Sequence, residues 1–123
     1  MPKTVLIADD RGEIRKTTRS VVETIPGCVV CGEAVDGADA VQKARELEPD
    51  LVIMDLAMPH MNGFDAARAL RTLGSRVPII LLTMYAYLIS PAQASAAGID
   101  VVVPKSGDVA GLTTQVERLL AAA

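Results

Sequence analysis

Five short apolar runs alternate along the chain with longer segments of helical periodicity, and this alternation restricts the fold more than any other feature. The predicted strands are Val5–Ala8, Val29–Val35, Leu51–Met54, Val77–Leu82 and Asp100–Pro104. Three of them are continuously apolar, as strands covered on both faces of a sheet tend to be. Strands separated by helices predict an α/β fold, in which right-handed crossovers build a parallel, doubly wound sheet.

The segments between the runs carry the signals of amphipathic helices. In the first segment, one face holds the side chains of Ile14, Thr18, Val21, Val22 and Ile25, and arginines at positions 11, 15 and 19 occupy the other. The fourth has signals at both ends: Ser90 as N-cap, Pro91 at the first helical position, Gln93 completing a capping box, and Gly98 just past the end. These signals support a regular alternation of strand and helix.

Length and charge narrow the classes of protein to which the chain can belong. Its 123 residues have the size of one domain, predicted to cover residues 1–123, and a 50% hydrophobic composition is typical of chains that fold alone. The net charge is −3 and the basic residues are scattered, so no basic stripe favours nucleic-acid binding. We find neither a secretory signal nor the roughly 20 apolar residues that cross a bilayer, and we expect a cytoplasmic protein.

The two cysteines, Cys28 and Cys31, lie close together in a predicted strand. Their spacing puts the two side chains on opposite faces of that strand. The chain offers no second Cys/His pair to complete a zinc site, so we interpret both as ordinary packing residues.

Polar side chains follow four of the predicted strands at the point where each strand ends. Asp9 and Asp10 follow the first strand, Asp55 the third, Thr83 the fourth and Lys105 the fifth. Since parallel strands bring these ends to one edge of the sheet, the five side chains are expected to converge. Close carboxylates repel one another by up to about 4 kcal/mol per pair at an effective dielectric of about 20, which favours a divalent cation. Oxygen ligands favour Mg²⁺, for which Mn²⁺ is the expected substitute.

The same residue types are the parts required for phosphoryl transfer. A cation and an ammonium group offset charge on the transferred oxygens, and an aspartate can be the nucleophile. Each residue alone has a plainer interpretation: Asp9 and Asp10 as helix N-caps, and Lys105 as a solvated turn residue. Asp55 is harder to explain in this way, because no helix begins directly after it. The joint occurrence at four strand ends favours the functional interpretation.

On these residues the chain resembles, over its whole length, the receiver domains of two-component response regulators. The matching features are the acidic pair in LIADD, the DLAMPHMNG segment, Thr83 after PIILL, and the lysine in VVVPK. The resemblance implies a flavodoxin-like (βα)5 sandwich with parallel strand order 2-1-3-4-5. The alternating pattern by itself leaves that order open, because a Rossmann-like order satisfies it equally.

The resemblance also implies a role for each matching residue. Asp55 would accept the phosphoryl group, Asp10 would bind Mg²⁺ directly, and Asp9 would do so mainly through water. The backbone carbonyl of Ala57 would complete the protein's share of the ligands. Lys105 would contact the phosphoryl group, and Thr83 would hydrogen-bond it and report its presence.

The implied partners are a phosphohistidine donor and a receiver of the signal. The donor would be a sensor histidine kinase or a histidine phosphotransfer protein, and the output would go to a downstream protein or domain, with a homodimer as a further candidate. Self-phosphorylation and self-dephosphorylation would be the only reactions, so the chain is not expected to be an enzyme. His60 lies at a variable position of the DLAMPHMNG segment, the signature loop of the family, and we interpret it as a solvated residue.

Three positions depart from the family pattern, and one of them is Ser106, where many members have a proline after the lysine. Many members have Tyr or Phe three residues before the lysine, where this chain has Val102, so any switch must work without that ring. The residue after Thr83 is usually small, but here it is Met84. In addition, the stretch from Met84 to Ile99 contains no charged residue, which indicates either a short helix lying flat on the core or a partner or dimer surface.

Three alternatives stay open. The chain could be the N-terminal receiver fragment of a longer DNA-binding response regulator. It could be a small Mg²⁺-dependent hydrolase with an aspartyl-phosphate intermediate, although it has no residues to spare for a substrate pocket or cap. It could also be an unphosphorylated interaction module of the same fold, against which the complete acidic set argues.

Overall fold

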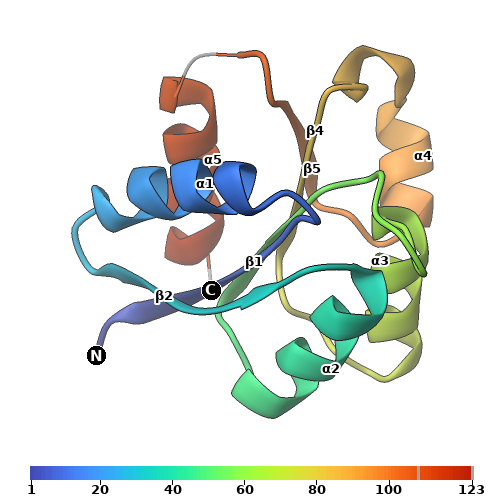
Figure 1. Cartoon of the computed structure of the whole chain (residues 1–123), viewed down its shortest axis with the longest axis horizontal. Coiled ribbons are helices and arrows are strands. Elements are labelled where there is room, and N and C mark those ends of the chain that lie inside the picture. Colours follow the sequence, from blue (N-terminus) through green and yellow to red (C-terminus); the bar gives the residue numbers. More distant parts are fainter. Residues whose placement is uncertain (108, 123) are drawn as a thin grey trace.

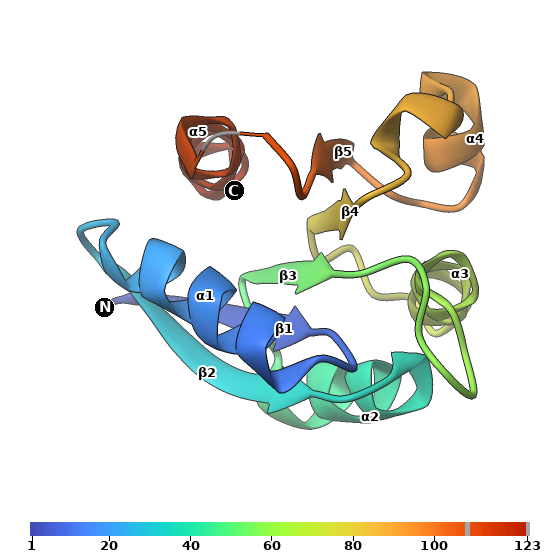
Figure 2. The same ribbon diagram turned by 45° about the horizontal axis from the view of Figure 1, so that its top comes forward.

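The strands form a single parallel sheet with a strand order that is not the order of the sequence. A computed structural model of the chain describes residues 1–107 and 109–122. The strands are β1 (Lys3–Ala8), β2 (Cys28–Ala34), β3 (Leu51–Met54), β4 (Ile79–Thr83) and β5 (Val101–Pro104). They pair in the order β2-β1-β3-β4-β5, which confirms the predicted flavodoxin-like order (Figure 2).

Helices cover both faces of this sheet and complete a three-layer sandwich. They are α1 (Gly12–Glu23), α2 (Gly37–Leu47), α3 (Gly63–Thr72), α4 (Pro91–Ala96) and α5 (Val109–Ala121), with a short 3₁₀ turn, η1 (Ala86–Leu88), before α4. In Figure 1, α1 and α5 lie on one side of the strands, and α2, α3 and α4 lie on the other. None of the helices in the described parts of the chain has the length and apolar character needed to span a membrane.

The core consists of two apolar clusters separated by the sheet. Alternate residues of one strand enter opposite clusters, so that Ile53 packs on the α1 and α5 side and Val52 on the other. All four residues of β3 are buried, as its continuously apolar sequence predicts. Cys31 and Cys28 pack against different clusters, which confirms that the two thiols face opposite sides of the sheet.

Local signals set most of the element ends. Ser90 caps α4 with the full capping box, Pro91 follows it, and Gly98 has a φ of 85° just beyond the C-cap, all as predicted. The predicted start of the fourth strand at Val77 is wrong by two residues. Pro78 explains the difference, because proline has no N–H to donate to a ladder and therefore marks the approach to the strand.

The two edge strands of the sheet differ in length. β2 forms one edge with seven residues, whereas β5 forms the other with four and ends at Pro104. This position agrees with the proline, which central strands do not tolerate. The carboxyl ends of β1, β3, β4 and β5 lie together along one side of the sheet, the carboxyl edge, and this is where the predicted site residues lie.

Candidate functional site

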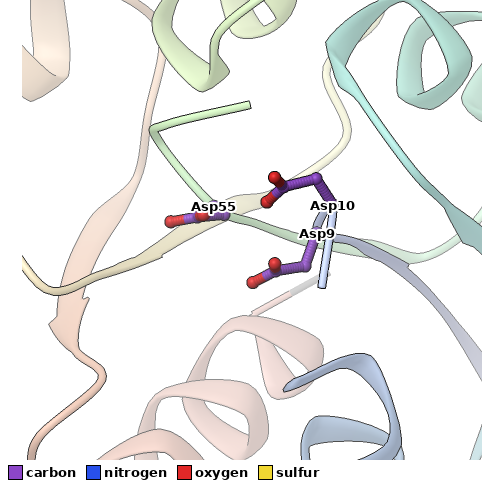
Figure 3. Close-up of side chains that lie close together, drawn as sticks. All are labelled: Asp9, Asp10 and Asp55. Carbon is purple, nitrogen blue, oxygen red and sulfur yellow. The ribbon is translucent and has the colours of Figure 1, made fainter. Parts of the chain in front are cut away.

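Three carboxylates meet beyond the ends of β1 and β3. One oxygen from each of Asp9, Asp10 and Asp55 lies within 4.8 Å of the others, and the three side chains extend into a common space (Figure 3). Asp9 and Asp55 are buried, with 3% and 8% of their surface exposed, whereas Asp10 is exposed. The strand pattern therefore correctly predicts the convergence of these residues.

The turn after β1 fixes Asp9 in a way that rules out a simple helix cap. Its N–H donates to the carbonyl of Ala34 at 3.0 Å, and its Oδ1 accepts from the N–H of Arg11 at 2.9 Å. The N-cap of α1 is Arg11, which makes no side-chain capping bond. The alternative interpretation of Asp9 and Asp10 as N-caps is thus wrong, because the N-cap position lies one residue after Asp10 and two residues after Asp9.

Asp55 lies where the backbone at the end of β3 comes close to the start of α3. Its N–H donates to the carbonyl of Ala8 at 2.9 Å, which continues the pairing of β3 with β1, and its Oδ1 accepts from the N–H of Leu56 at 2.8 Å. A side chain on Gly63 would collide with the backbone carbonyl of Asp55, so only glycine lets α3 start at this place. The signature loop between Asp55 and Gly63 is folded tightly by these contacts.

Lys105 reaches the cluster from the end of β5. Its Nζ lies 2.7 Å from Oδ2 of Asp9 and 3.3 Å from Oδ2 of Asp55, and its side chain is 12% exposed. Its backbone N–H donates to the carbonyl of Thr83 at 3.0 Å, which continues the pairing of β5 with β4 by one residue. The interpretation of Lys105 as a solvated turn lysine is therefore wrong.

The charges at this edge do not cancel. Burial raises the pKa of Asp55 above that of an exposed carboxyl; the ammonium of Lys105 opposes this rise, and the negative charge of Asp9 adds to it. Three carboxyl groups thus meet a single ammonium group at this edge. A divalent cation with a preference for oxygen ligands fits this set of donors.

Thr83 and Ala57 occupy the positions that the sequence predicts for them. Thr83 is the last residue of β4 and is fully buried, and its Oγ1 accepts from the N–H of Tyr85 at 3.1 Å. Ala57 lies two residues after Asp55 in the signature loop. The structure thus places all the predicted site residues at the carboxyl edge of the sheet.

The signature loop is also tied to the start of α2, which sequence reasoning did not predict. His60 has a φ of 67°, and its Nδ1 lies 2.8 Å from Oδ2 of Asp36, the N-cap of α2. The N–H of Gly37 donates to the carbonyl of Met61 at 3.0 Å. The pKa of Asp36 is lowered, first by the N–H of Asp39 and then by His60. His60 is 75% exposed at its side chain, so its interpretation as a solvated residue is right about exposure but misses this contact.

Comparison with known proteins identifies the family. Residues 5–117 match the family described as response regulator receiver domain. The chain belongs to the response regulator receiver family. Receiver domains are the signalling domains of two-component systems, and members of the family generally use Mg²⁺.

Individual relatives of this receiver domain come from several kinds of protein. This chain is 37% identical over 117 residues to a protein-glutamate methylesterase/protein-glutamine glutaminase of Nocardioides sp., and the match covers 94% of this chain and 32% of the relative. It is 42% identical over 81 residues to the chemotaxis protein CheY of Thermotoga maritima, covering 66% and 67% of the two chains. The chain thus spans about a third of the length of the methylesterase relative.

A solved structure resembles this receiver domain along nearly the whole chain. The two-component response regulator of the LuxR family from Aurantimonas sp. superimposes with a TM-score of 0.89 at 33% identity, covering 99% of this chain and 87% of that one. These similarities reach proteins with different outputs, so they establish the receiver fold and family without naming a partner.

Proposed function

We propose that this receiver accepts a phosphoryl group on Asp55 from a phosphohistidine donor in a Mg²⁺-dependent reaction. The observation that carries the proposal is the meeting of Asp9, Asp10 and Asp55 with the ammonium of Lys105 at one edge of the sheet. A buried carboxylate beside a cationic group and two further carboxylates has the features of a nucleophile in phosphoryl transfer.

In the proposed step, an Asp55 oxygen forms a bond to phosphorus while the bond from phosphorus to the donor's imidazole nitrogen breaks. That nitrogen keeps the electron pair and takes up a proton. Lys105, already 3.3 Å from Asp55, offsets negative charge on the phosphoryl oxygens. The donor is a sensor histidine kinase or a histidine phosphotransfer protein.

Asp10 and Asp55 would bind Mg²⁺ directly, Asp9 mainly through water, and Ala57 through its backbone carbonyl; Mn²⁺ would substitute. When bound, the ion supplies positive charge to the transferred oxygens. The fit rests on the net charge of the cluster and on its donor atoms, all of them oxygen. Asp10 is the exposed member, which leaves this side of the cluster open to a hydrated ion.

The readout would start at Thr83. Its hydroxyl accepts from the N–H of Tyr85, and a phosphoryl group on Asp55 would compete for that hydroxyl. The loop that follows exposes several large apolar side chains, those of Met84, Tyr85, Tyr87 and Leu88. We propose this loop and α4 as the region that signals to a downstream protein or domain, or to a second copy of the chain.

The chain forms one receiver domain over residues 1–123 in this proposal, with self-phosphorylation and self-dephosphorylation as its only reactions. Its match to only part of the methylesterase relative supports the alternative that it works as the receiver of a longer regulator. That such a regulator binds DNA stays a prediction. The expected cytoplasmic location stays a prediction.

Incubation with acetyl phosphate and Mg²⁺ tests the proposal. Electrophoresis on a phosphate-binding gel should show one retarded species, and intact-mass measurement should show the gain of a single phosphoryl group. Omission of the metal, or addition of a chelator, should prevent both. Phosphorylation that proceeds equally well with a chelator, or at a residue other than Asp55, would overturn the assignment.

A further inference from the structure

Asp9 and Asp10 are held by very different numbers of contacts. Asp9 makes four contacts. Its N–H donates to the carbonyl of Ala34, and its own carbonyl accepts from Arg15. Its Oδ1 accepts from the N–H of Arg11, and its Oδ2 accepts from Lys105. In the part of the chain that the structure describes, no group donates a hydrogen bond to the Asp10 carboxylate. The direction of the Asp10 side chain therefore depends on the backbone that carries it.

Arg15 controls that backbone. Its Nη1 donates to the carbonyl oxygen of Asp9 at 2.8 Å, and this carbonyl belongs to the peptide that joins Asp9 to Asp10. Because a peptide unit is planar, fixing its oxygen also fixes the direction of the bond that leads to the Cα of Asp10. Arg15 can thus influence the carboxylate of Asp10 without touching it.

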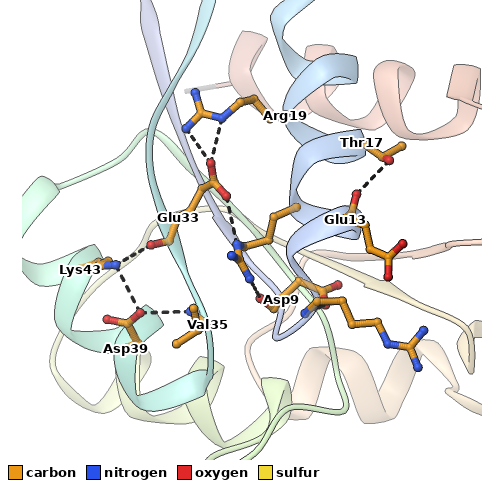
Figure 4. A network of polar contacts seen from close by, with 10 residues as sticks. Asp9, Glu13, Thr17, Arg19, Glu33, Val35, Asp39 and Lys43 are labelled. Atoms are coloured by element: carbon orange, nitrogen blue, oxygen red, sulfur yellow. Dashed lines mark hydrogen bonds and ion pairs between the residues drawn. The ribbon is translucent and has the colours of Figure 1, made fainter.

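A second contact holds Arg15 in place. Its Nε donates to Oε1 of Glu33 at 3.0 Å, and the two side chains are 19% and 31% exposed. Arg19 binds the other oxygen of Glu33, with Nε at 2.9 Å and Nη2 at 2.8 Å (Figure 4). Hydrogen bonds from Arg19 and then from Arg15 lower the pKa of Glu33, which keeps it charged at neutral pH. The arginine face predicted for the first helix is therefore bound to β2 at positions 15 and 19.

We propose that Arg15 is a positioning residue that orients the Asp10 carboxylate for binding the divalent cation. The inference rests on the proposed function, because it assigns a role within the same site. Glu33 and Arg15 act together: Glu33 orients the guanidinium, and the guanidinium fixes the Asp9–Asp10 peptide. Supporting contacts of this kind around metal ligands commonly change metal affinity by about tenfold or more when they are removed.

Charge and position predict opposite results for the loss of Arg15. A positive guanidinium close to the acidic cluster repels a cation, so electrostatics alone predicts that an uncharged side chain tightens Mg²⁺ binding. The positioning role predicts that binding weakens. The sign of the change in affinity therefore distinguishes the two.

Arg15→Met removes both hydrogen bonds, and Arg19→Met is its matched control. Arg19 contacts the same carboxylate and carries the same charge, but among its contacts in the described residues none reaches Asp9. Isothermal titration of the full chain with Mg²⁺ should show roughly tenfold weaker binding for Arg15→Met and less than about twofold change for Arg19→Met. Unchanged or tighter binding by Arg15→Met overturns the proposal.

Two further variants complete the test. In an Asp10→Asn background, adding Arg15→Met should weaken Mg²⁺ binding no further, because Arg15 acts through Asp10. An equal loss in both backgrounds contradicts the inference. Arg15→Lys keeps the charge but cannot span both acceptors, so it should also bind Mg²⁺ more weakly; affinity equal to that of the unsubstituted chain contradicts the positioning role. If the unsubstituted chain fails to bind Mg²⁺, the proposed function falls together with this inference. If the unsubstituted chain binds Mg²⁺ but the Arg15 variants give one of the contradicting results above, only the inference is overturned.

Discussion

The Nζ of Lys105 lies closer to Asp9, at 2.7 Å, than to Asp55, at 3.3 Å. The ammonium thus bridges the two buried carboxylates of the cluster and reduces their mutual repulsion. Without a cation, Lys105 is the main compensating charge for both of them among the described residues.

Lys105→Met should therefore destabilise the protein at neutral pH, by about 1–3 kcal/mol in the free energy of unfolding. Lys105 stabilises the ionised form of Asp55, so this contribution is present above the pKa of Asp55 and is lost as acidification protonates that carboxyl. Urea unfolding at neutral and at acidic pH should show a deficit that shrinks in acid. The exposed Lys16→Met is the control and should have little effect at either pH; a deficit independent of pH would contradict the role of charge.

Asp55→Asn should abolish phosphorylation by acetyl phosphate while the fold is retained, because the amide keeps the shape but removes the nucleophile. Intact-mass measurement and circular dichroism report these two results. Asp65→Asn, an exposed carboxyl in α3, should leave phosphorylation unchanged. Phosphate uptake by Asp55→Asn at the parent rate would refute the assignment.

The same Asp55→Asn substitution should raise stability at neutral pH, on the order of 1 kcal/mol. The pKa of Asp55 is raised in the folded state, so its ionised form costs stability above that pKa. The cost disappears as the pH falls below the pKa of the unfolded state, because the carboxyl is then protonated in both states. Unfolding midpoints measured across acidic and neutral pH should converge in acid; a constant difference would count against the buried-charge explanation.

Asp10→Ala should weaken Mg²⁺ binding by at least about tenfold and increase the stability of the metal-free protein, since one repelling carboxylate is gone. Calorimetric titration gives the affinity, and thermal unfolding with a chelator gives the stability. Glu13→Ala, an exposed acidic residue in the first turn of α1, is the control for general loss of negative charge. A metal affinity equal to that of the parent would exclude Asp10 as a ligand.

Beryllofluoride with Mg²⁺, in place of the phosphoryl group, should perturb the amide NMR signals of residues 84–97 more than those of residues 41–47. The reason is the bond from the N–H of Tyr85 to Thr83, which would weaken when the hydroxyl turns toward the bound group. This route does not require an aromatic ring at Val102. Small and equal shifts in both regions would leave the uncharged stretch as ordinary packing.

Gly63→Ala should destabilise the protein by about 2–4 kcal/mol, because the new methyl group meets the backbone carbonyl of Asp55, which cannot move away cheaply. Gly12→Ala is the matched control, since a methyl group there would lie 3.5 Å from Nη2 of Arg15, at an ordinary van der Waals distance. Chemical denaturation of both variants provides the comparison. Equal stability of the two would show that the signature loop yields more easily than its contacts indicate.

The sequence predicts the fold and the convergence of the site because both depend on local patterns. Apolar runs of strand length define the sheet, and a parallel sheet brings Asp9, Asp55 and Lys105 to the same edge wherever the strands lie within it. The strand order itself came from the family resemblance, because no local pattern distinguishes the possible orders.

The contacts that the sequence did not reveal join segments far apart in the chain. Glu33 meets Arg15 only because β2 pairs beside β1 and α1 packs across both strands. His60 meets Asp36 because the signature loop turns back over the start of α2. Polar residues on a helix face have the same sequence pattern whether they are solvated or paired, so their partners depend on tertiary packing.

The short edge strand β5 bears on how the folded protein avoids self-association through its sheet. The N–H of Lys105 points to β4, so the preceding position, Pro104, faces the open edge, where it has no N–H to offer an incoming strand. An uncharged stretch lies close by in sequence, and charge is the other common protection of sheet edges. Pro104 therefore leaves β5 with one backbone donor fewer for pairing with the edge strand of another molecule.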